Sequence, residues 1–259
     1  VVYGSDTPTN FTINVATGSL DFVASDNVER QATTEYNKTS NVGKYPISVT
    51  TTADENNYEV VIPNANVVVS PKEIVANITL PTNLVYDALA KVVEVSFQGV
   101  INDDVINAVI SYNGEIEAVD AGNYTITVAC DSDNYVVKAI TTGNTFTITP
   151  AELKFSVENG HKGYGSAKVE FEGESVGYTY EGEIFARDAK GVNINVVFDT
   201  LTSEEINQTY NEVLYVSLSG AKAGNYTATT VKKGNVTIVA NKLSNIELKS
   251  ESNVYDATN

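Results

Sequence analysis

The sequence predicts a mostly β chain that is built from tandem repeats. Short runs alternate apolar side chains with threonine, as in residues 124–130, which is the pattern of a strand with one buried face. Clusters of Asp, Asn, Ser and Gly, such as residues 131–134, separate these runs and are typical of turns. The same landmarks return in a fixed order along the chain, which indicates that one β-rich unit is repeated.

Three landmarks define each repeat: an aromatic turn, then a Gly-x-Tyr step, then a closing strand that ends in a junction. The aromatic turns are residues 2–4, 85–87, 163–165 and 254–256. The Gly-x-Tyr steps are residues 43–45, 122–124 and 224–226, and the closing strands with their junctions are residues 67–71, 146–150 and 236–240. Agreement in both order and type makes chance recurrence a poor explanation.

The spacing of the landmarks predicts the repeat boundaries. A separation of 79 residues divides Pro71 from Pro150 and also Tyr45 from Tyr124. The step at residues 224–226 comes 102 residues after the previous one, so we expect the third repeat to be divergent and to contain an insertion before this step. We therefore predict repeats over residues 1–71, 72–150 and 151–240, with the first strand of a truncated fourth repeat over residues 241–259.

The repeats are out of phase with the two ends of the sequence. The first one opens at its aromatic turn without the strand that precedes this turn elsewhere, whereas residues 241–259 supply such a strand. We therefore expect a piece of a longer protein, with strand exchange between copies of the fragment at the unpaired sheet edge. No apolar run approaches the roughly 18 residues of a membrane span, so no membrane insertion is expected.

One landmark resembles a known structural corner. Asp120-Ala121-Gly122-Asn123-Tyr124 has the form of the tyrosine corner of immunoglobulin-type sandwiches, in which the Tyr hydroxyl bonds to backbone upstream. Ile126 stands where antibody domains have a cysteine, and Cys130, of the same parity, is predicted to be a buried inert thiol. We therefore expect small immunoglobulin-like sandwich repeats in an elongated rod, spanning roughly 75 to 100 Å at about 3.3 Å per strand residue.

Two segments predict short helices at loop positions. Residues 202–205 have the S/T-x-x-E form of a capping box, and Ile206 and Tyr210 follow at helical spacing. Residues 103–108 are a second candidate. If these helices form, each repeat is a β-rich α+β unit, which is the alternative fold class.

The landmarks resemble those of the bacterial MBG and YDG repeats, which occur in tandem in large surface proteins and adhesins. Residues 3–8, 41–45, 57–58 and 70–71 match the pattern in the first repeat, and residues 85–87, 120–124, 134–135 and 148–150 match it in the second. The third repeat keeps residues 223–226 but lacks a separate Asn-Tyr pair after them. The resemblance implies repeat architecture, an extracellular location on the bacterial cell surface and no catalytic residues.

Charge and composition exclude several functions. The chain has 33 acidic and 16 basic residues, a net charge of -17, and this field repels nucleic acid. One Cys and one His leave no internal disulfide and no zinc site. A nucleophile would depend on His161 as its base, and His161 lies in a turn-like stretch where we expect an exposed structural residue. The sequence therefore predicts no enzyme and no catalytic residues.

The nearest candidate for a metal site is a set of acids near one end of the second repeat. Asp120, Asp131 and Asp133 offer the oxygen ligands that calcium prefers. Turn chemistry explains the same residues, because Asp side chains bond to backbone two residues further on. Calcium is thus the only cofactor for which the sequence has a candidate site.

Three functions are compatible with these patterns. The leading one is a non-catalytic stalk or spacer of a bacterial surface adhesin, because the junctions between repeats contain almost no flexible sequence. One alternative is a module that binds a host glycan or a host protein, with the insertion of the third repeat as its expected place. The other is an accessory segment beside an extracellular enzyme.

Overall fold

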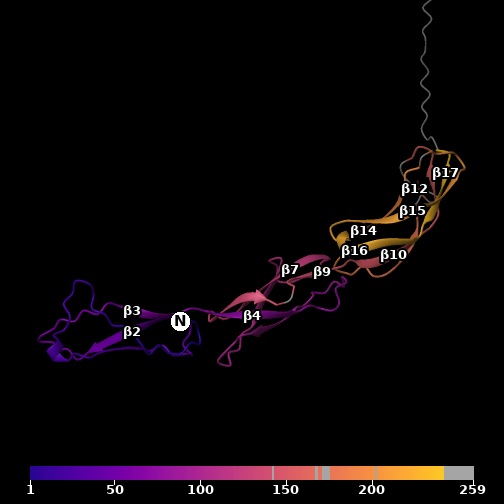
Figure 1. Cartoon of the computed structure of the whole chain (residues 1–259). Helices are drawn as coiled ribbons and strands as arrows, with labels where there is room; N and C mark the ends of the chain where they lie inside the picture. The colour runs from indigo at the N-terminus through magenta and orange to yellow at the C-terminus, as the bar shows by residue number, and fades with distance from the viewer. Residues whose placement is uncertain (142, 167–168, 171–175, 202, 242–259) are drawn as a thin grey trace, which may run out of the picture. The chain divides into compact units, whose positions relative to one another are not determined.

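A computed structural model describes the chain except for residues 142, 167–168, 171–175, 202 and 242–259 (Figure 1). The chain divides into two compact units. Unit 1 consists of Val1–Leu84, Ala90–Ala118 and Asn123–Thr147, and unit 2 consists of Val85–Leu89, Val119–Gly122 and Ile148–Asn259. The aromatic turn and the Asp-Ala-Gly step of repeat 2 thus group with repeat 3.

The described residues form strands and two single 3₁₀ turns. The first nine strands belong to unit 1 apart from Gly122 and Ile148: β1 Arg30–Thr34, β2 Gly43–Thr51, β3 Ala65–Val69, β4 Lys72–Thr79, β5 Glu94–Gln98, β6 Ala108–Tyr112, β7 Gly122–Cys130, β8 Tyr135–Ile140 and β9 Thr145–Ile148. Unit 2 contains β10 Ala151–Val157, β11 Gly160–Gly163, β12 Val169–Glu170, β13 Tyr178–Glu181, β14 Asn193–Phe198, β15 Thr209–Ser219, β16 Tyr226–Lys232 and β17 Gly234–Val239. The 3₁₀ turns are Ala24–Asp26 and Ala223–Asn225.

Unit 1 contains three sheets of three strands each. Repeat 2 has two of them, ordered β5-β4-β8 and β6-β7-β9, and β4 pairs in parallel with β8. Repeat 1 has one, ordered β1-β2-β3, in which both pairs are antiparallel, as is the pair of β6 and β7. No described strand of repeat 1 corresponds to β4, β5 or β8.

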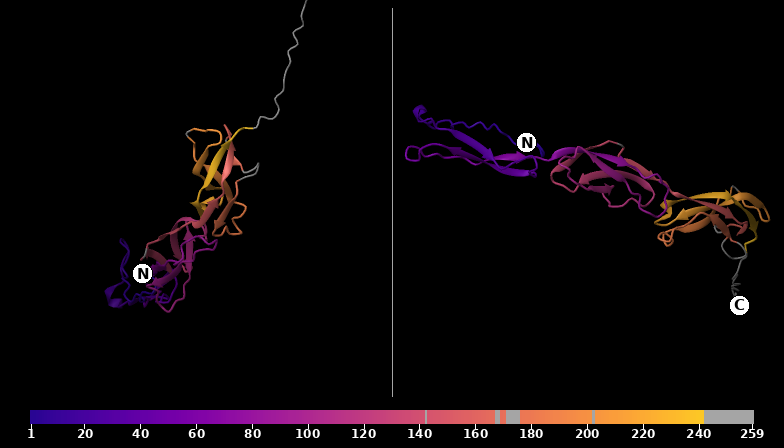
Figure 2. Two further views of the ribbon diagram at one scale, coloured as in Figure 1. Left: turned by 90° about the vertical axis from the view of Figure 1, so that its right-hand side faces the viewer. Right: turned by 90° about the horizontal axis from the view of Figure 1, so that it is seen from below.

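Unit 2 repeats the two-sheet arrangement with additions. One sheet has the order β13-β10-β16, with β10 and β16 parallel, and the other has the order β12-β11-β17-β15-β14. Figure 2 shows both sheets of this unit from two further sides. The additions are β11 and β12, because the aromatic turn, an isolated parallel bridge in the first two repeats, becomes a four-residue strand beside β17.

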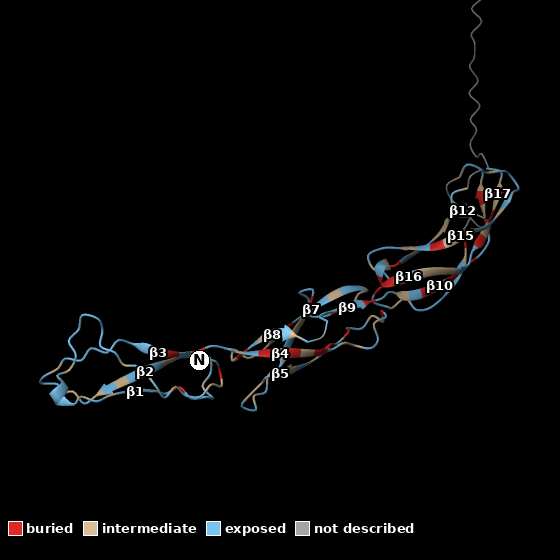
Figure 3. Cartoon of the chain, viewed as in Figure 1, coloured by how far each residue is buried: buried red, intermediate tan, exposed pale blue. Residues whose placement is uncertain are grey.

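The core follows from the alternation of side chains along the strands. On β4 the buried side chains are Ile74, Ala76 and Ile78, and on β10 they are Leu153, Phe155 and Val157 (Figure 3). In unit 1, a single cluster joins Tyr3, Tyr36, Val67 and Val69 of repeat 1 to Ile74 and Tyr135 of repeat 2. The apolar core therefore continues across the boundary between these repeats.

The prediction of a mostly β chain is confirmed, and the predicted helices are wrong. The described residues contain no α-helix, and thus no helix among them is long and apolar enough to cross a membrane. Asp104 lies in a turn, and Glu204 accepts hydrogen bonds from Lys162 Nζ and from Gly165 N instead of capping a helix. Thr202, the first residue of the capping box, lies outside the described residues. Tertiary partners therefore outweigh the local helix signals.

The strand register corrects our alignment of repeat 3. Tyr226 lies opposite Ala151 at the start of a parallel pair, just as Tyr135 lies opposite Lys72. Residues 225–226 are therefore the Asn-Tyr pair of repeat 3, and the prediction that this repeat lacks such a pair is wrong. The counterpart of Tyr45, which pairs with Val67, is Tyr210, which pairs with Val236. Residues 224–226 resemble a Gly-x-Tyr step because Gly224 directly precedes the Asn-Tyr pair.

Candidate functional site

Unit 1 contains a cluster of two tyrosines and an aspartate at the boundary between repeats 1 and 2. The hydroxyl of Tyr3, from the aromatic turn of repeat 1, donates to Oδ2 of Asp104 at 2.8 Å. The hydroxyl of Tyr135, from repeat 2, donates to the same oxygen at 2.6 Å and accepts from Ile101 N at 3.2 Å. The two rings meet edge to face with centroids 5.4 Å apart.

Unit 2 contains the same cluster one repeat further along. Tyr86, from the aromatic turn of repeat 2, donates its hydroxyl to Oδ2 of Asp188. Tyr226 donates to this oxygen at 3.0 Å and accepts from Phe185 N at 3.0 Å. The two tyrosine rings again meet edge to face, with centroids 5.5 Å apart. The aromatic turn of one repeat therefore inserts a tyrosine into a socket on the next.

A short turn builds each socket. Asp104 N donates to Ile101 O at 3.1 Å, and Asp188 N donates to Phe185 O at 2.9 Å. Both turns set the carboxylate beside the backbone N–H of their first residue, and this N–H orients the hydroxyl of the socket tyrosine. Asp188 is fully buried and Asp104 is half-buried, and in each cluster two tyrosine hydroxyls donate to Oδ2 of the carboxylate, which needs such donors once it is removed from water.

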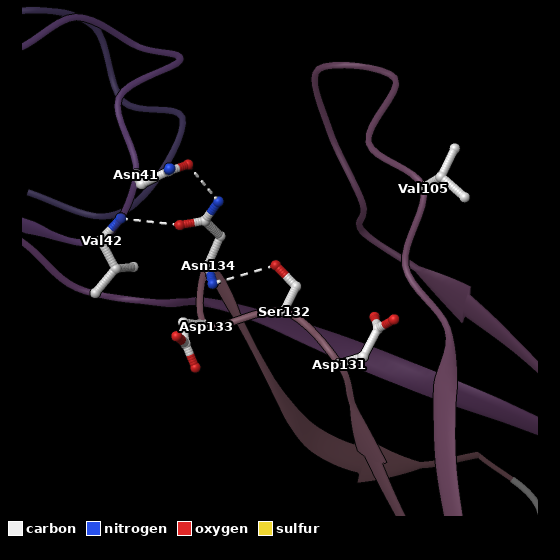
Figure 4. Close-up of a pocket in the computed structure, with 7 residues that line it drawn as sticks. All are labelled: Asn41, Val42, Val105, Asp131, Ser132, Asp133 and Asn134. Atoms are coloured by element: carbon white, nitrogen blue, oxygen red, sulfur yellow. Dashed lines mark hydrogen bonds between the residues drawn. The ribbon is translucent and has the colours of Figure 1, made fainter.

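An asparagine makes a second contact at each boundary. Oδ1 of Asn134 accepts from Val42 N at 2.9 Å, and its Nδ2 donates to Oδ1 of Asn41 at 2.8 Å (Figure 4). In unit 2, Oδ1 of Asn225 accepts from Ala121 N at 2.8 Å, and its Nδ2 donates to Oδ1 of Asp120 at 3.0 Å. The Asn-Tyr pair of one repeat thus binds the residues before the Gly-x-Tyr position of the repeat before it.

The aromatic turn itself is held in the same way in all three repeats. The backbone N–H of Tyr3 donates to Ser70 O at 2.9 Å, that of Tyr86 to Thr149 O at 2.8 Å and that of Tyr164 to Val239 O at 2.9 Å. Ser70 and Thr149 directly follow a closing strand, and Val239 is the last residue of one. The closing strand therefore fixes the position of the tyrosine that the next repeat receives.

Burial keeps the tyrosine hydroxyls of both clusters protonated, so they remain hydrogen-bond donors. Burial, followed in effect by the neighbouring carboxylates, raises the pKa of Tyr135 and of Tyr226 to about 12. The pKa values of Tyr3 and Tyr86 are also raised, with burial as the first cause. At neutral pH all four hydroxyls therefore keep their protons and can donate to the aspartates.

The structure does not gather the three calcium candidates into one site. Asp120, in unit 2, accepts from Lys222 Nζ at 2.7 Å. Asp131 accepts from N and Nδ2 of Asn107 at 2.8 and 2.7 Å, and the carboxylates of Asp131 and Asp133 point apart in an open, polar recess of unit 1 (Figure 4). No group of three or more His, Cys, Asp or Glu side chains in the described part of the chain could hold a metal. Calcium binding stays a prediction.

The remaining single-residue predictions have mixed outcomes. The tyrosine corner predicted at Tyr124 stays a prediction, whereas in repeat 1 the hydroxyl of Tyr45 makes a bond of this kind, donating to Asn41 O at 2.8 Å. Cys130 has the expected parity on β7 but is only half-buried, because it lies at the end of its strand. His161 lies on strand β11, between β12 and β17, so the turn predicted there is wrong.

Sequence reasoning found the tyrosines of the clusters but missed their aspartates. Asp104 lay within a predicted helix, and Asp188 was not singled out among the 33 acids. The available signal is weak: an acid three residues after an apolar residue, followed much later by an Asn-Tyr pair. Only the repetition of this combination in the structure shows its purpose.

These features define a β-rich tandem-repeat module in which recurring residues join one repeat to the next. Residues 1–68 match the family model described as MBG domain (YGX type), which confirms the resemblance for this part of the chain. The MBG domain is a non-catalytic repeat module typical of large surface proteins, and no catalytic family matches the chain. No curated protein and no solved structure matches it either.

Proposed function

We propose that the chain is a non-catalytic stalk segment of a bacterial surface adhesin, with MBG-type repeats throughout. The observation that carries the proposal is that the landmark tyrosines make the contacts between one repeat and the next. Tyr3 and Tyr86 are 4% and 2% exposed because each inserts into the following repeat. A spacer needs a fixed length, and contacts between neighbouring repeats provide it. Residues that recur in every repeat and make these contacts are therefore expected in a stalk.

Short connections support the same proposal. β3 ends at Val69 and β4 begins at Lys72, and β9 ends at Ile148 while β10 begins at Ala151. Linkers of this length leave little freedom between neighbouring repeats, because flexible reach grows with the number of linker residues. Two small sheets in a repeat, as in repeat 2, are compatible with the immunoglobulin-like sandwich that we expect.

Small-angle X-ray scattering of the full chain tests the stalk. We expect one narrow distance distribution that reaches roughly 75 to 100 Å, as estimated from the strand rise. The double variant Asp104→Ala and Asp188→Ala, which removes both acceptors, should broaden this distribution. A broad distribution for the unchanged chain would contradict the proposal.

Binding assays distinguish the stalk from a recognition module. The full chain is applied to a glycan array and to immobilised host-matrix proteins, and a stalk should give no signal above that of a size-matched control protein. Saturable binding that variants in repeat 3 abolish would instead support the host glycan or host protein alternative.

A further inference from the structure

The first and the last segment of repeat 3 run side by side in the same direction. Residues 151–163 contain β10 and β11, and residues 226–239 contain β16 and β17. β10 pairs in parallel with β16, and β11 pairs in parallel with β17. The two segments therefore form one parallel ladder that joins the beginning of the repeat to its end.

The two segments stay together where they pass from one sheet to the other. β10 and β16 belong to the sheet β13-β10-β16, whereas β11 and β17 belong to the five-stranded sheet. Between the sheets, Asn235 N donates to Oδ1 of Asn159 at 2.8 Å. A Cβ at Gly234 would overlap with the carbonyl oxygen of Glu158, so the two backbones lie against each other at this crossing.

The apolar core covers one face of the ladder. Leu153, Phe155 and Val157 of the first segment are buried, and so are Val236 and Ile238 of the last segment. A hydrogen bond that breaks on a face without water leaves a donor and an acceptor with no replacement partner, which makes its loss costly. Burial therefore strengthens the ladder against opening.

The chain enters and leaves the ladder at opposite ends. Ala151 lies opposite Tyr226 at one end, and Gly163 lies opposite Val239 at the other. In Figure 1, β10 and β16 lie near one end of unit 2 and β17 lies near the other. Tension along the chain therefore pulls the two segments in opposite directions along their common axis.

Such a pull strains the ladder in shear. The hydrogen bonds of a parallel pair are evenly spaced along the two strands. When one strand slides past the other, these bonds are stretched together, so many must break at once. When two strands are instead pulled apart sideways from one end, the bonds break one after another, and each step needs less force.

We propose that repeat 3 carries mechanical tension, and that the parallel ladder is the clamp that keeps it folded while the chain is pulled from its ends. The inference deepens the stalk proposal and rests on it for its purpose, since a stalk transmits force between the parts that it joins. In repeat 2, β4 pairs with β8 in the same way, but the aromatic turn adds only the bridge between Val85 and Thr149. Repeat 3, which adds β11, should therefore unfold at the higher force of the two.

Single-molecule force spectroscopy of the full chain in two pulling directions tests the clamp. Glu152→Cys and Thr227→Cys supply attachment points at exposed residues that lie opposite each other near one end of the ladder, and Cys130→Ser removes the native thiol. Pulled through its chain ends, this variant should release roughly 250 Å of chain when repeat 3 unfolds, at about 3.5 Å per residue.

The force of this event should be larger than the force needed to unfold repeat 3 through the two cysteines. The same folded protein is measured in both directions, so a difference in stability cannot explain a difference in force. Forced unfolding depends on the barrier along the pulled direction, and shear and sideways pulling meet different barriers.

A matched pair of glycine variants tests the crossing between the sheets. Gly234→Ala places a methyl group against the backbone of Glu158 and should lower the force at which repeat 3 unfolds through the chain ends. Gly224→Ala is the control, because a Cβ there meets no atom within 4 Å and the residue precedes β16. It should leave the force unchanged. Circular dichroism of both variants checks that they are folded.

Equal forces in the two pulling directions would overturn the proposal, because the ladder would then resist shear no better than sideways opening. An equal effect of Gly234→Ala and Gly224→Ala on the force through the chain ends would also overturn it. Either result leaves the stalk proposal to its own tests by scattering and binding. A chain that fails those tests can still show the directional difference, so the two proposals fail separately.

Discussion

The boundary clusters of the two units share one geometry and differ in burial. Asp188 is fully buried, and its Oδ2 accepts from three side chains: Tyr86, Tyr226 and Asn225. Asp104 is half-buried and accepts from two tyrosines, one from each repeat. The turn and the Asn-Tyr pair therefore define the contact, and the surrounding residues decide how much stability it contributes.

The 3₁₀ turn before β16 explains much of the difference. It places Asn225 so that Nδ2 donates both to Asp120 at 3.0 Å and to Asp188 at 3.2 Å. Asn225 thereby links the tyrosine cluster to the asparagine contact in unit 2. Asn134, its counterpart in unit 1, donates to Asn41. A linked network should respond more strongly to the loss of one member.

Removal of each aspartate in turn should show the largest difference in stability between the two clusters. Asp188→Ala leaves three buried donors without their acceptor, and we expect a loss of about 3 kcal/mol in unfolding free energy. Asp104→Ala should cost about 1 to 2 kcal/mol, because only two donors are affected and water reaches the site more readily. Urea unfolding followed by tyrosine fluorescence measures both. Asp→Asn at each position keeps one acceptor oxygen and is the control, and equal losses for the two alanine variants would contradict the comparison.

A side chain at Gly4 should disrupt the contact of unit 1 specifically. A Cβ there would lie 1.9 Å from Cδ1 of Ile101, and Gly4 has a φ of +83° that β-branched residues rarely adopt. We expect Gly4→Val to cost about 2 to 4 kcal/mol. Thermal unfolding measures the loss. Ile101→Ala in the same chain should recover part of it by removing the clash, and no recovery would show that backbone strain alone causes the effect.

The residue that follows the aromatic turn of repeat 2 should respond to substitution in the opposite direction. This residue is Ala88, whose left-handed backbone, with a φ of +62°, costs about 1 kcal/mol relative to glycine. Ala88→Gly should therefore stabilise the chain by about 0.5 kcal/mol after the entropy cost of glycine is included. Ala90→Gly, nearby but without a positive φ, is the control and should destabilise the chain. Thermal unfolding of both variants measures the two signs.

The smallest expected effect concerns the ion pair of unit 2. Burial raises the pKa of Asp120, but hydrogen bonds from Lys222 and Asn225 outweigh it and hold the pKa below its ordinary value. The pair therefore adds stability above about pH 4, and this contribution is lost as the pH falls through the lowered pKa. Because the two side chains are 33% and 44% exposed, we expect less than about 1 kcal/mol.

Urea midpoints of the chain and of Lys222→Gln, compared at pH 5 and pH 3, measure this contribution. The difference between the two proteins should shrink at pH 3. A difference that stays constant would mean that Lys222 acts through packing rather than through charge.

Prediction of the clusters from sequence succeeded for residues that recur and failed for those that depend on a partner. Tyr3, Tyr86 and Asn134 were identified as landmarks because their neighbours also recur. Asp104 and Asp188 lack such a context, since one side chain that accepts from tyrosines of two repeats leaves no local pattern. The Asn-Tyr pair of repeat 3 was misread because a nearby glycine produced the wrong landmark. The predicted repeat boundaries remain a prediction.

The sequence by itself determined the β content and the order of the repeats, because alternation, turn residues and recurrence are local properties of the chain. Only the tertiary structure decided what the landmarks do. The hydroxyls of Tyr3 and Tyr86 take their meaning from carboxylates about a hundred residues away, and no local pattern encodes such a distance. The register of β10 and β16 was likewise decided by packing, since a parallel pair is set by the apolar faces that it buries.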